Sequence, residues 1–299
     1  MKGNHILVVL VGALGFASPL GAAISLELAE GIRHDRLTLS NSGFGGHPTT
    51  VSELMFKSHR IYNTSLALKM QSDRVFFRVE GSYGTVHDAT LRDQDFGKDH
   101  HRDLWCSTDR ALSHCYTADA SATIGLITHP TTGLTLSPAL GYRFDYAKFG
   151  MEDSYHKQLV HQKNLDLRLD HLHSWQRSFF DAPFVGTDFS WQLLPRLSLF
   201  GDAYFLFAVK YHGKAYWNLR KTHFHESSRR ENGFGEKAAL GLSYELFSHF
   251  FIKAQYNESY LNARKGTMSY RHRHNHGQVP FHRARFLSQE VRLGIEYLF

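Results

Sequence analysis

Apolar and polar residues alternate through the last nine positions of the chain. Five of these positions carry apolar or aromatic side chains: Val291, Leu293, Ile295, Tyr297 and Phe299. Arg292, Gly294 and Glu296 lie between them, and Leu298 is the one exception. A period of two predicts a β-strand with one apolar and one polar face. A strand of this kind that ends on an aromatic residue is typical of the closing strand of a bacterial outer-membrane β-barrel.

The same alternation recurs in long runs along the chain. Between residues 134 and 146, for example, Leu140 and Phe144 fall on one face, whereas Arg143 and Asp145 fall on the other. Soluble strands are usually about 5 or 6 residues long, so these runs favour a membrane barrel over a soluble sandwich. Turn residues divide the runs into ten predicted strands, near residues 25–40, 51–71, 74–90, 117–129, 133–150, 172–193, 197–216, 234–247, 250–270 and 286–299.

The predicted connections alternate between short and long. Tight turns are expected near residues 72–73, 130–133, 194–196 and 247–249, and long loops near 41–50, 88–116, 151–171, 217–233 and 271–285. Short periplasmic turns and long outer loops are the rule for outer-membrane barrels. We therefore predict an all-β fold, a ten-stranded antiparallel transmembrane β-barrel with long extracellular loops.

The N-terminus has the pattern of a secretory signal peptide. Lys2 precedes a short apolar run, and three small residues end at Ala23. The alternative is a short transmembrane anchor, which Pro19 disfavours because it interrupts the run. We expect export to the bacterial outer membrane, with a signal peptide over residues 1–23 and the barrel over residues 24–299.

Composition agrees with an exported barrel. The mean hydropathy of −0.35 is low because only alternate residues are apolar. The chain contains 14 Tyr and 23 Phe, which suit aromatic girdles. The predicted inner face carries both signs of charge, at Arg78, Glu80, Arg143, Asp145, Asp202, Lys237, Glu245, Glu290, Arg292 and Glu296. In a narrow barrel these charges would pair across the interior, which disfavours an open porin-like channel.

The chain has two cysteines, Cys106 and Cys115, and both fall in the longest predicted loop. In an oxidising compartment they could form a disulfide that holds this loop. Two free thiols are the alternative. We expect the disulfide.

Several short motifs follow one another in the order found in a known family. They are Val51-Ser-Glu-Leu-Met-Phe-Lys57, Arg92-Asp-Gln-Asp-Phe96, Gly141-Tyr142, Gln176-Arg177 with Pro183-Phe-Val-Gly186, Lys265-Gly266 and Glu296-Tyr-Leu-Phe299. Together they resemble the omptin family of outer-membrane proteases. The resemblance implies a ten-stranded barrel with an active-site cleft at its extracellular rim. It also implies that Asp93 and Asp95 are one catalytic pair of an aspartyl-type endopeptidase, positioning the water that attacks the peptide bond.

The other catalytic pair of omptins, Asp-x-His, is not evident in this chain. The resemblance aligns Ala215 and Trp217 with those two positions. His212 is the nearest imidazole, and the alternation predicts that it faces the lumen, where it could act as a base. Two functions therefore stay open: an omptin-like endopeptidase acting on peptides or proteins, and a non-catalytic surface barrel whose loops bind host molecules, lipopolysaccharide or metal.

The resemblance implies lipid as a partner and no cofactor, although omptins require lipopolysaccharide. Arg177 falls in a stretch that resembles part of the lipopolysaccharide site, whereas Phe144 and Tyr146 replace the acidic and basic residues expected after Tyr142. A net charge of +6 favours contact with the phosphates of outer-membrane lipid and lipopolysaccharide. Export argues against a nucleic-acid partner.

The resemblance does not explain the 21 histidines, which concentrate in the predicted loops. His272, His274 and His276 are two residues apart, so an extended chain would place all three on one face. Zn²⁺ or Cu²⁺ could bind there, but no cysteine or carboxylate completes an evident site. The alternative is a set of solvated histidines, and we assign no metal ligand.

Overall fold

The computed structural model describes residues 23–42, 50–98, 102–151, 154–160, 163–169, 173–218, 221–272 and 275–299. Apart from Ala23, the predicted signal peptide lies outside the described residues. So do part of the predicted loop near 41–50 and His274. Among the described residues, no helix is long and apolar enough to span a membrane.

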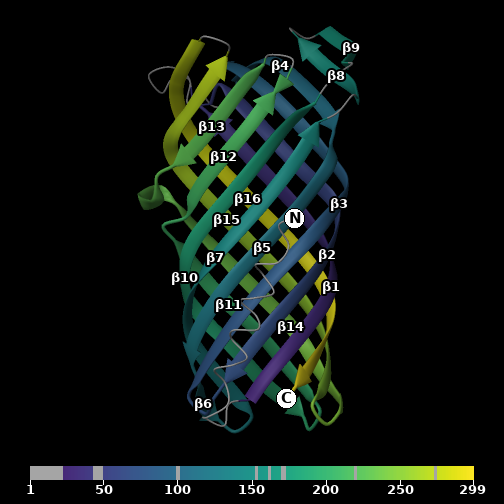
Figure 1. Ribbon diagram of the computed structural model, residues 1–299, viewed down its shortest axis with the longest axis vertical. Coiled ribbons are helices and arrows are strands. Elements are labelled where there is room, and N and C mark those ends of the chain that lie inside the picture. The colour runs from purple at the N-terminus through teal and green to yellow at the C-terminus, as the bar shows by residue number, and fades with distance from the viewer. Residues whose placement is uncertain are drawn as a thin grey trace, which may run out of the picture.

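Ten long strands form a closed antiparallel ring (Figure 1). They are β1 (Ala23–Asn41), β2 (Ser52–Gln71), β3 (Val75–Lys98), β5 (Ser113–Leu126), β7 (Leu134–Met151), β10 (Ser174–Leu194), β11 (Leu197–Phe207), β14 (Phe234–Phe247), β15 (Phe250–His272) and β16 (Asn275–Leu298). Neighbours in this order pair with each other, and β16 pairs with β1 from Leu298 opposite Ser25 onward, which closes the ring. The predicted ten-stranded barrel is confirmed.

Much of what we predicted as long loops is also strand. β4 (Arg102–Ala111) continues the line of β5 along β3, and β13 (Thr222–Ser228) continues β14 along β15. β12 (Lys210–Trp217), most of which falls in the predicted strand 197–216, continues β11 along β10. The remaining elements are β6 (Thr128–Thr131), the hairpin β8 (Ser154–Val160) and β9 (Lys163–Leu169) paired with β4, and a 3-10 helix η3 (Arg230–Asn232). The strands continue because buried apolar residues, such as Leu91 in β3 and Phe281 in β16, line the lumen there.

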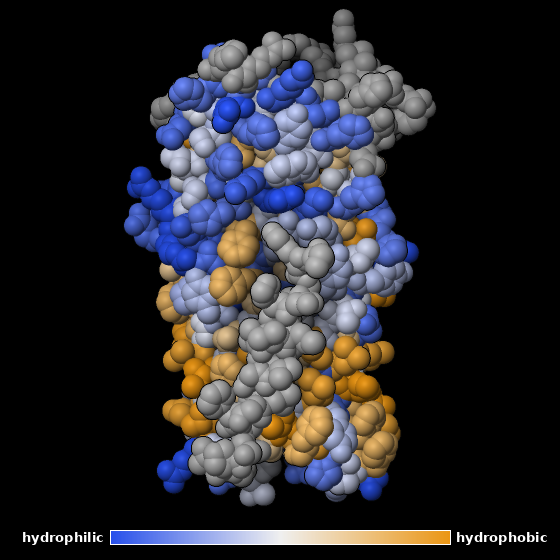
Figure 2. Space-filling view, viewed as in Figure 1, coloured by the Kyte–Doolittle hydropathy of each residue, from blue (hydrophilic) through white to orange (hydrophobic). Residues whose placement is uncertain are grey.

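The barrel has two different ends, which we call the turn end and the hairpin end. Short connections gather at the turn end, and β4, β8, β9, β12 and β13 extend the hairpin end (Figure 1). On the face that Figure 2 shows, a belt of hydrophobic surface crosses the part nearer the turn end, whereas the rest of the visible surface is mainly hydrophilic. Outward residues of this apolar belt include Leu140, Leu240 and Leu293, each at least half exposed. Exposed apolar side chains on a barrel are suited to contact with lipid.

Charged side chains fill the lumen within the belt, as the sequence predicts. Arg292 forms an ion pair with Glu80 at 2.7 Å, and Arg143 forms one with Asp145 at 2.6 Å. Arg33 contacts both Asp35 and Asp119. These ion pairs satisfy charges that would otherwise be costly to bury.

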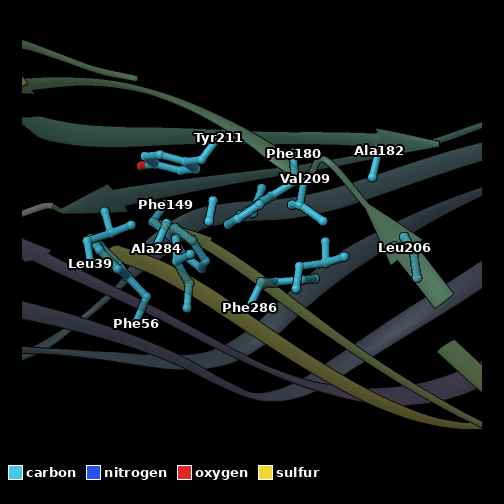
Figure 3. Close-up of a cluster of buried hydrophobic side chains, with 14 of the residues drawn as sticks. Leu39, Phe56, Phe149, Phe180, Ala182, Leu206, Val209, Tyr211, Ala284 and Phe286 are labelled. Carbon is cyan, nitrogen blue, oxygen red and sulfur yellow. The ribbon is translucent and has the colours of Figure 1, made fainter. Parts of the chain in front are cut away.

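An apolar cluster fills the lumen next to these ion pairs, toward the hairpin end (Figure 3). Phe56 stacks on Phe149 with ring centres 4.6 Å apart, and Tyr211 stacks on Phe281 at 5.3 Å. All four side chains are almost fully buried. In the part of the chain that the structure describes, the lumen is therefore packed at two successive levels, which is the structure of a closed barrel and not of a wide pore.

The predicted disulfide between Cys106 and Cys115 is wrong. Cys106 lies in β4 opposite Asp95, whereas β5, which contains Cys115, pairs with β3 over residues 75–85. The cysteines are thus nine residues apart along one side of β3, which corresponds to roughly 30 Å at about 3.3 Å per residue. A disulfide requires Cα atoms about 4.4–6.8 Å apart. Cys115 has a free, buried thiol.

Candidate functional site

Asp93 and Asp95 lie on the lumen face of β3, at the hairpin end. They share this face with Leu91, which is fully buried, and their neighbours across β2 are Leu54 and Ser52. Both carboxylate side chains are half-buried, and both take part in interactions within the fold. The structure therefore brings the two carboxylates to one face, as their spacing of two residues predicts.

The two positions that the resemblance aligns with an Asp-x-His pair carry neither an acid nor an imidazole. Ala215 is buried, with 4% of its surface exposed, and it faces the lumen from β12. Trp217 packs against the apolar cluster. A methyl group and an indole provide no acid or base for proton transfer.

His212 lies on the outer face of the barrel, so its predicted lumen position is wrong. Its neighbour Tyr211 is fully buried in the lumen, and His212 itself is exposed. The reason is the break between β11 and β12, where Ala208 has a positive φ of 51°. An extra residue at such a bulge moves every following side chain to the other face. Partial removal of the imidazole from water and the nearby Lys210 also lower the pKa of His212.

The structure adds a carboxylate that our sequence analysis missed, Glu226 of β13. Its side chain is 5% exposed and lies opposite Gly213 of β12. The Tyr211 hydroxyl donates a hydrogen bond to Glu226 Oε2 at 2.7 Å, and Gln176 Nε2 donates another at 3.5 Å. A Cβ atom on Gly213 would lie 2.4 Å from the same oxygen, so only glycine leaves room for this carboxyl group.

Burial determines the protonation of Glu226. Removal from water disfavours the charged form and raises the pKa of this carboxyl to about 7, although the two hydrogen bonds act in the opposite direction. The sequence contains a signal for this residue: Thr222, Phe224, Glu226 and Ser228 alternate with more exposed positions. The prediction of a loop over residues 217–233 missed this alternation.

His272 and His276 lie in β15 and β16, on either side of the hairpin, and His274 lies outside the described residues. Arg271 pairs with His276, so the chain reverses between His272 and His276. His272 Nδ1 contacts the Thr222 hydroxyl at 3.1 Å. Within the described residues there is no group of three or more His, Cys, Asp or Glu side chains arranged to hold a metal ion.

A row of three basic residues crosses the outer face of the barrel. Arg177 of β10 pairs with Lys148 of β7 on one side and with Lys214 of β12 on the other, so the three side chains point in the same direction. The Arg177 guanidinium lies 4.7 Å from the Trp175 ring centre, and Lys148 lies 5.6 Å from that of Tyr116. We call Lys148, Arg177 and Lys214 the basic row.

The basic row lies just beyond the apolar belt. Along β7 the outward residues change from Leu140 and Phe144, which are well exposed, to Lys148 nearer the hairpin end. Between belt and row, Asp181 accepts hydrogen bonds from Tyr142 and from Arg230 of η3. Cations at the boundary between an apolar surface and a polar one are well placed for lipid headgroups.

A closed ring of long antiparallel strands with an apolar outer belt and a charged interior defines an outer-membrane β-barrel. The chain belongs to the family of Protochlamydia outer membrane proteins (Pom), because the model of this family matches residues 27–299. No curated protein matches the sequence.

One solved structure shows the same fold. The outer membrane protease OmpT from Escherichia coli is 12% identical to this chain, with a TM-score of 0.82 over 95% of this chain and 100% of OmpT. A major outer membrane protein from Thermus thermophilus is 13% identical, with a TM-score of 0.34 over 93% of this chain and 100% of that protein. The first likeness shows a shared fold. The outer-membrane barrel is confirmed, and membership of the omptin family stays a prediction.

Proposed function

We propose that this protein is a closed, non-catalytic surface barrel that binds lipopolysaccharide through the basic row. The main support for this proposal is that Lys148, Arg177 and Lys214 are direct neighbours across three adjacent strands. Each cation near an anionic lipid surface contributes about 1 kcal/mol of attraction. The hairpin end would then face the outside of the cell, because lipopolysaccharide occupies the outer leaflet there.

Two features support a non-catalytic role. The resemblance aligns Ala215 and Trp217 with the second catalytic pair, and His212 points away from the lumen. The ion pairs and the apolar cluster that fill the lumen also argue against conduction of solutes. These features favour the outer surface as the site of the proposed function.

Trp175 offers a direct test, because its ring contacts the central cation of the row. Lipopolysaccharide titrated into the refolded barrel in detergent should change the tryptophan fluorescence saturably. Arg177→Gln and Lys214→Gln should each weaken binding about fivefold, which corresponds to about 1 kcal/mol. Arg196→Gln, at an exposed turn-end position, makes the same change in net charge and should leave the affinity unchanged. Equal affinity of all four proteins would refute the proposed site.

One arrangement favours a second candidate, an endopeptidase. β13 occupies the ring position of β14, which is five strands from β3 in either direction. Glu226 pairs with Met268, eighteen residues along β15 from Phe250. β3 and β15 both begin at the turn end, and Asp93 is also eighteen residues along its strand, counted from Val75. Asp93 and Asp95 therefore lie at a distance from the turn end similar to that of Glu226. Carboxylates therefore face the lumen from two opposite walls.

In such an enzyme, Asp93 and Asp95 would hold the attacking water, and Glu226 would accept its proton and transfer it to the leaving amine. A raised pKa of Glu226 suits a carboxyl group that accepts and returns a proton near neutral pH. The test is cleavage of a mixed peptide library by the barrel refolded with lipopolysaccharide, beside Asp93→Asn, Asp95→Asn and Glu226→Gln. Loss of cleavage in the variants would establish the enzyme. No cleavage by the folded wild type would leave the non-catalytic barrel.

A further inference from the structure

Five cations lie together on the outer face of the barrel, on the wall opposite the basic row. They come from four neighbouring strands: Arg36 of β1, Lys57 of β2, Arg264 of β15, and Arg283 and Arg285 of β16. Each is next in sequence to a buried member of the apolar cluster, namely Leu37, Phe56, Ala263, Ala284 or Phe286. Successive residues of a strand face opposite sides, so all five side chains point outward. We call these five residues the cation patch.

The register of the strands brings like charges together in this patch. Arg36 is the direct partner of Lys57 across β1 and β2, and Arg264 is the direct partner of Arg283 across β15 and β16. Like charges in directly opposite positions destabilise a sheet. Two such pairs on one surface therefore favour the binding of an anion from outside the protein.

The described part of the fold supplies no ion-pair partner to the patch. None of the five cations forms an ion pair with a residue that the structure describes. Arg264 lies instead beside the Phe234 ring, with its guanidinium carbon 5.6 Å from the ring centre. Partial removal from water and the neighbouring Arg285 and Arg264 lower the pKa of Arg283, as expected where cations outnumber anions. The connection between β1 and β2, over residues 43–49, contains no acidic residue.

Two carboxylates border the patch, and both have partners within the fold. Glu53 of β2 accepts a hydrogen bond from the Ser40 hydroxyl at 3.3 Å. Glu258 of β15 accepts one from the Tyr256 hydroxyl at 2.9 Å. Five cations beside two carboxylates leave an excess of three positive charges on this surface.

The cation patch lies at the same level of the barrel as the basic row. Arg264 is fourteen residues from Phe250, at the turn end of β15, and Lys148 is fourteen residues from Leu134, at the turn end of β7. In the ring of ten strands, β1 is five strands from β10 in either direction. The two groups of cations therefore lie on opposite walls, each just beyond the apolar belt.

The surface next to the patch is apolar on its turn-end side. Ile32 of β1 and Val291 of β16 are direct partners in the belt, and they are 50% and 60% exposed. A soluble polyanion would contact the cations alone, whereas a phosphorylated lipid would contact the cations through its headgroup and the belt through its acyl chains. The arrangement therefore favours a lipid with several negative charges in its headgroup.

We propose that the cation patch binds a second lipopolysaccharide molecule, through the phosphates of its lipid A part. The phosphates lie between the two like-charge pairs, and the acyl chains lie along the belt below them. This inference extends the proposed function and rests on its orientation of the barrel, with the hairpin end outward. It concerns a separate set of residues, so each site can be tested without the other.

Native mass spectrometry of the refolded barrel tests the second site, with lipid A added in steps to the detergent solution. We expect two lipid A molecules on the wild type. The double variant Arg264→Gln with Arg283→Gln removes two cations and should weaken one of the two sites roughly 30-fold. Arg74→Gln with Arg196→Gln makes the same change in net charge at exposed positions of the turn end and should leave both sites unchanged.

A second pair of substitutions keeps the test independent of any one variant. Arg36→Gln with Lys57→Gln removes the other like-charge pair and should weaken the same site by a similar factor. Heat-modified mobility on gels verifies that each variant is folded. Equal retention of two lipid A molecules by the wild type and by both folded patch variants would overturn the proposal. Heparin that binds the patch more tightly than lipid A would overturn the assignment to a lipid.

The Trp175 fluorescence titration separates this inference from the proposed function, because Trp175 contacts the basic row and not the patch. The patch variants should leave that titration unchanged. One lipid A molecule per wild-type barrel, with a saturable fluorescence change, would refute the second site and leave the basic row intact. A site that is lost in the patch variants, in a protein whose Trp175 fluorescence does not respond to lipid A, would support the patch and refute the basic row.

Discussion

Glu226 should make the stability of the barrel depend on pH in a window that its own pKa determines. Burial raises the pKa of the folded carboxyl from 4.5 to about 7. The folded state therefore keeps this proton between those pH values, while the unfolded state loses it. Because the folded state binds more protons in this window, the free energy of unfolding contributed by Glu226 falls as the pH rises from about 4.5 to about 7.

The size of the effect follows from the same interval. At about 1.4 kcal/mol per pH unit, the loss amounts to roughly 3 kcal/mol between pH 4.5 and pH 8. Glu226→Gln keeps the shape and the acceptor for the Tyr211 hydroxyl but does not ionise. The variant should thus match the wild type near pH 4.5 and exceed its stability by about 3 kcal/mol near pH 8.

The assay is urea unfolding of both proteins in the same lipid vesicles across this pH range. The measured quantity is the difference between their free energies of unfolding, because contributions from the 21 histidines and other titrating groups cancel in it. A difference that stays constant from pH 4.5 to pH 8 would refute the reasoning. It would mean that Glu226 is well solvated or that a cation pairs with it.

Three further predictions concern the interior. Arg143→Met leaves Asp145 buried without its ion-pair partner and should lower the free energy of unfolding by about 3–5 kcal/mol. The double variant Arg143→Met with Asp145→Leu should recover most of this loss. Urea unfolding measures the free energy of unfolding of both variants. Phe149→Ala removes a fully buried ring and should cost about 3–5 kcal/mol in the same assay. Cys115 should react with a maleimide only after unfolding, because burial raises the pKa of its thiol to about 11. A reducing agent should leave the free energy of unfolding unchanged, because this thiol is free. An unfolding transition that shifts on reduction would indicate a disulfide with Cys106.

Much of the fold could be predicted from local patterns. Each strand shows its two faces through its own alternation, as β16 does from Val291 to Phe299. The predicted strand number and the pairing of lumen charges are both confirmed. A membrane strand must place apolar groups toward lipid and polar groups inward, so each pair of successive residues indicates which face of the strand points toward lipid. This is why one sequence was sufficient for the architecture.

The hairpin end was harder to predict because its strands are no longer in contact with lipid. Around residues 88–116 and 217–233, polar residues occupy the outer face, so the segments resemble loops in sequence. They are strands because their inner faces pack on the apolar cluster and their backbones pair with neighbours that are distant in the chain. Local composition does not contain those contacts.

The sequence by itself determined the class of the protein, the barrel, the opposed faces of each strand and the position of Asp93 and Asp95 on one face. Only the tertiary structure decided which side chains meet. The break at Ala208 turned His212 outward, the register of β4 and β5 separated Cys106 from Cys115, and pairing across three strands aligned the basic row. The physical reason is that alternation is a property of one strand, whereas register and bulges depend on hydrogen bonds between strands.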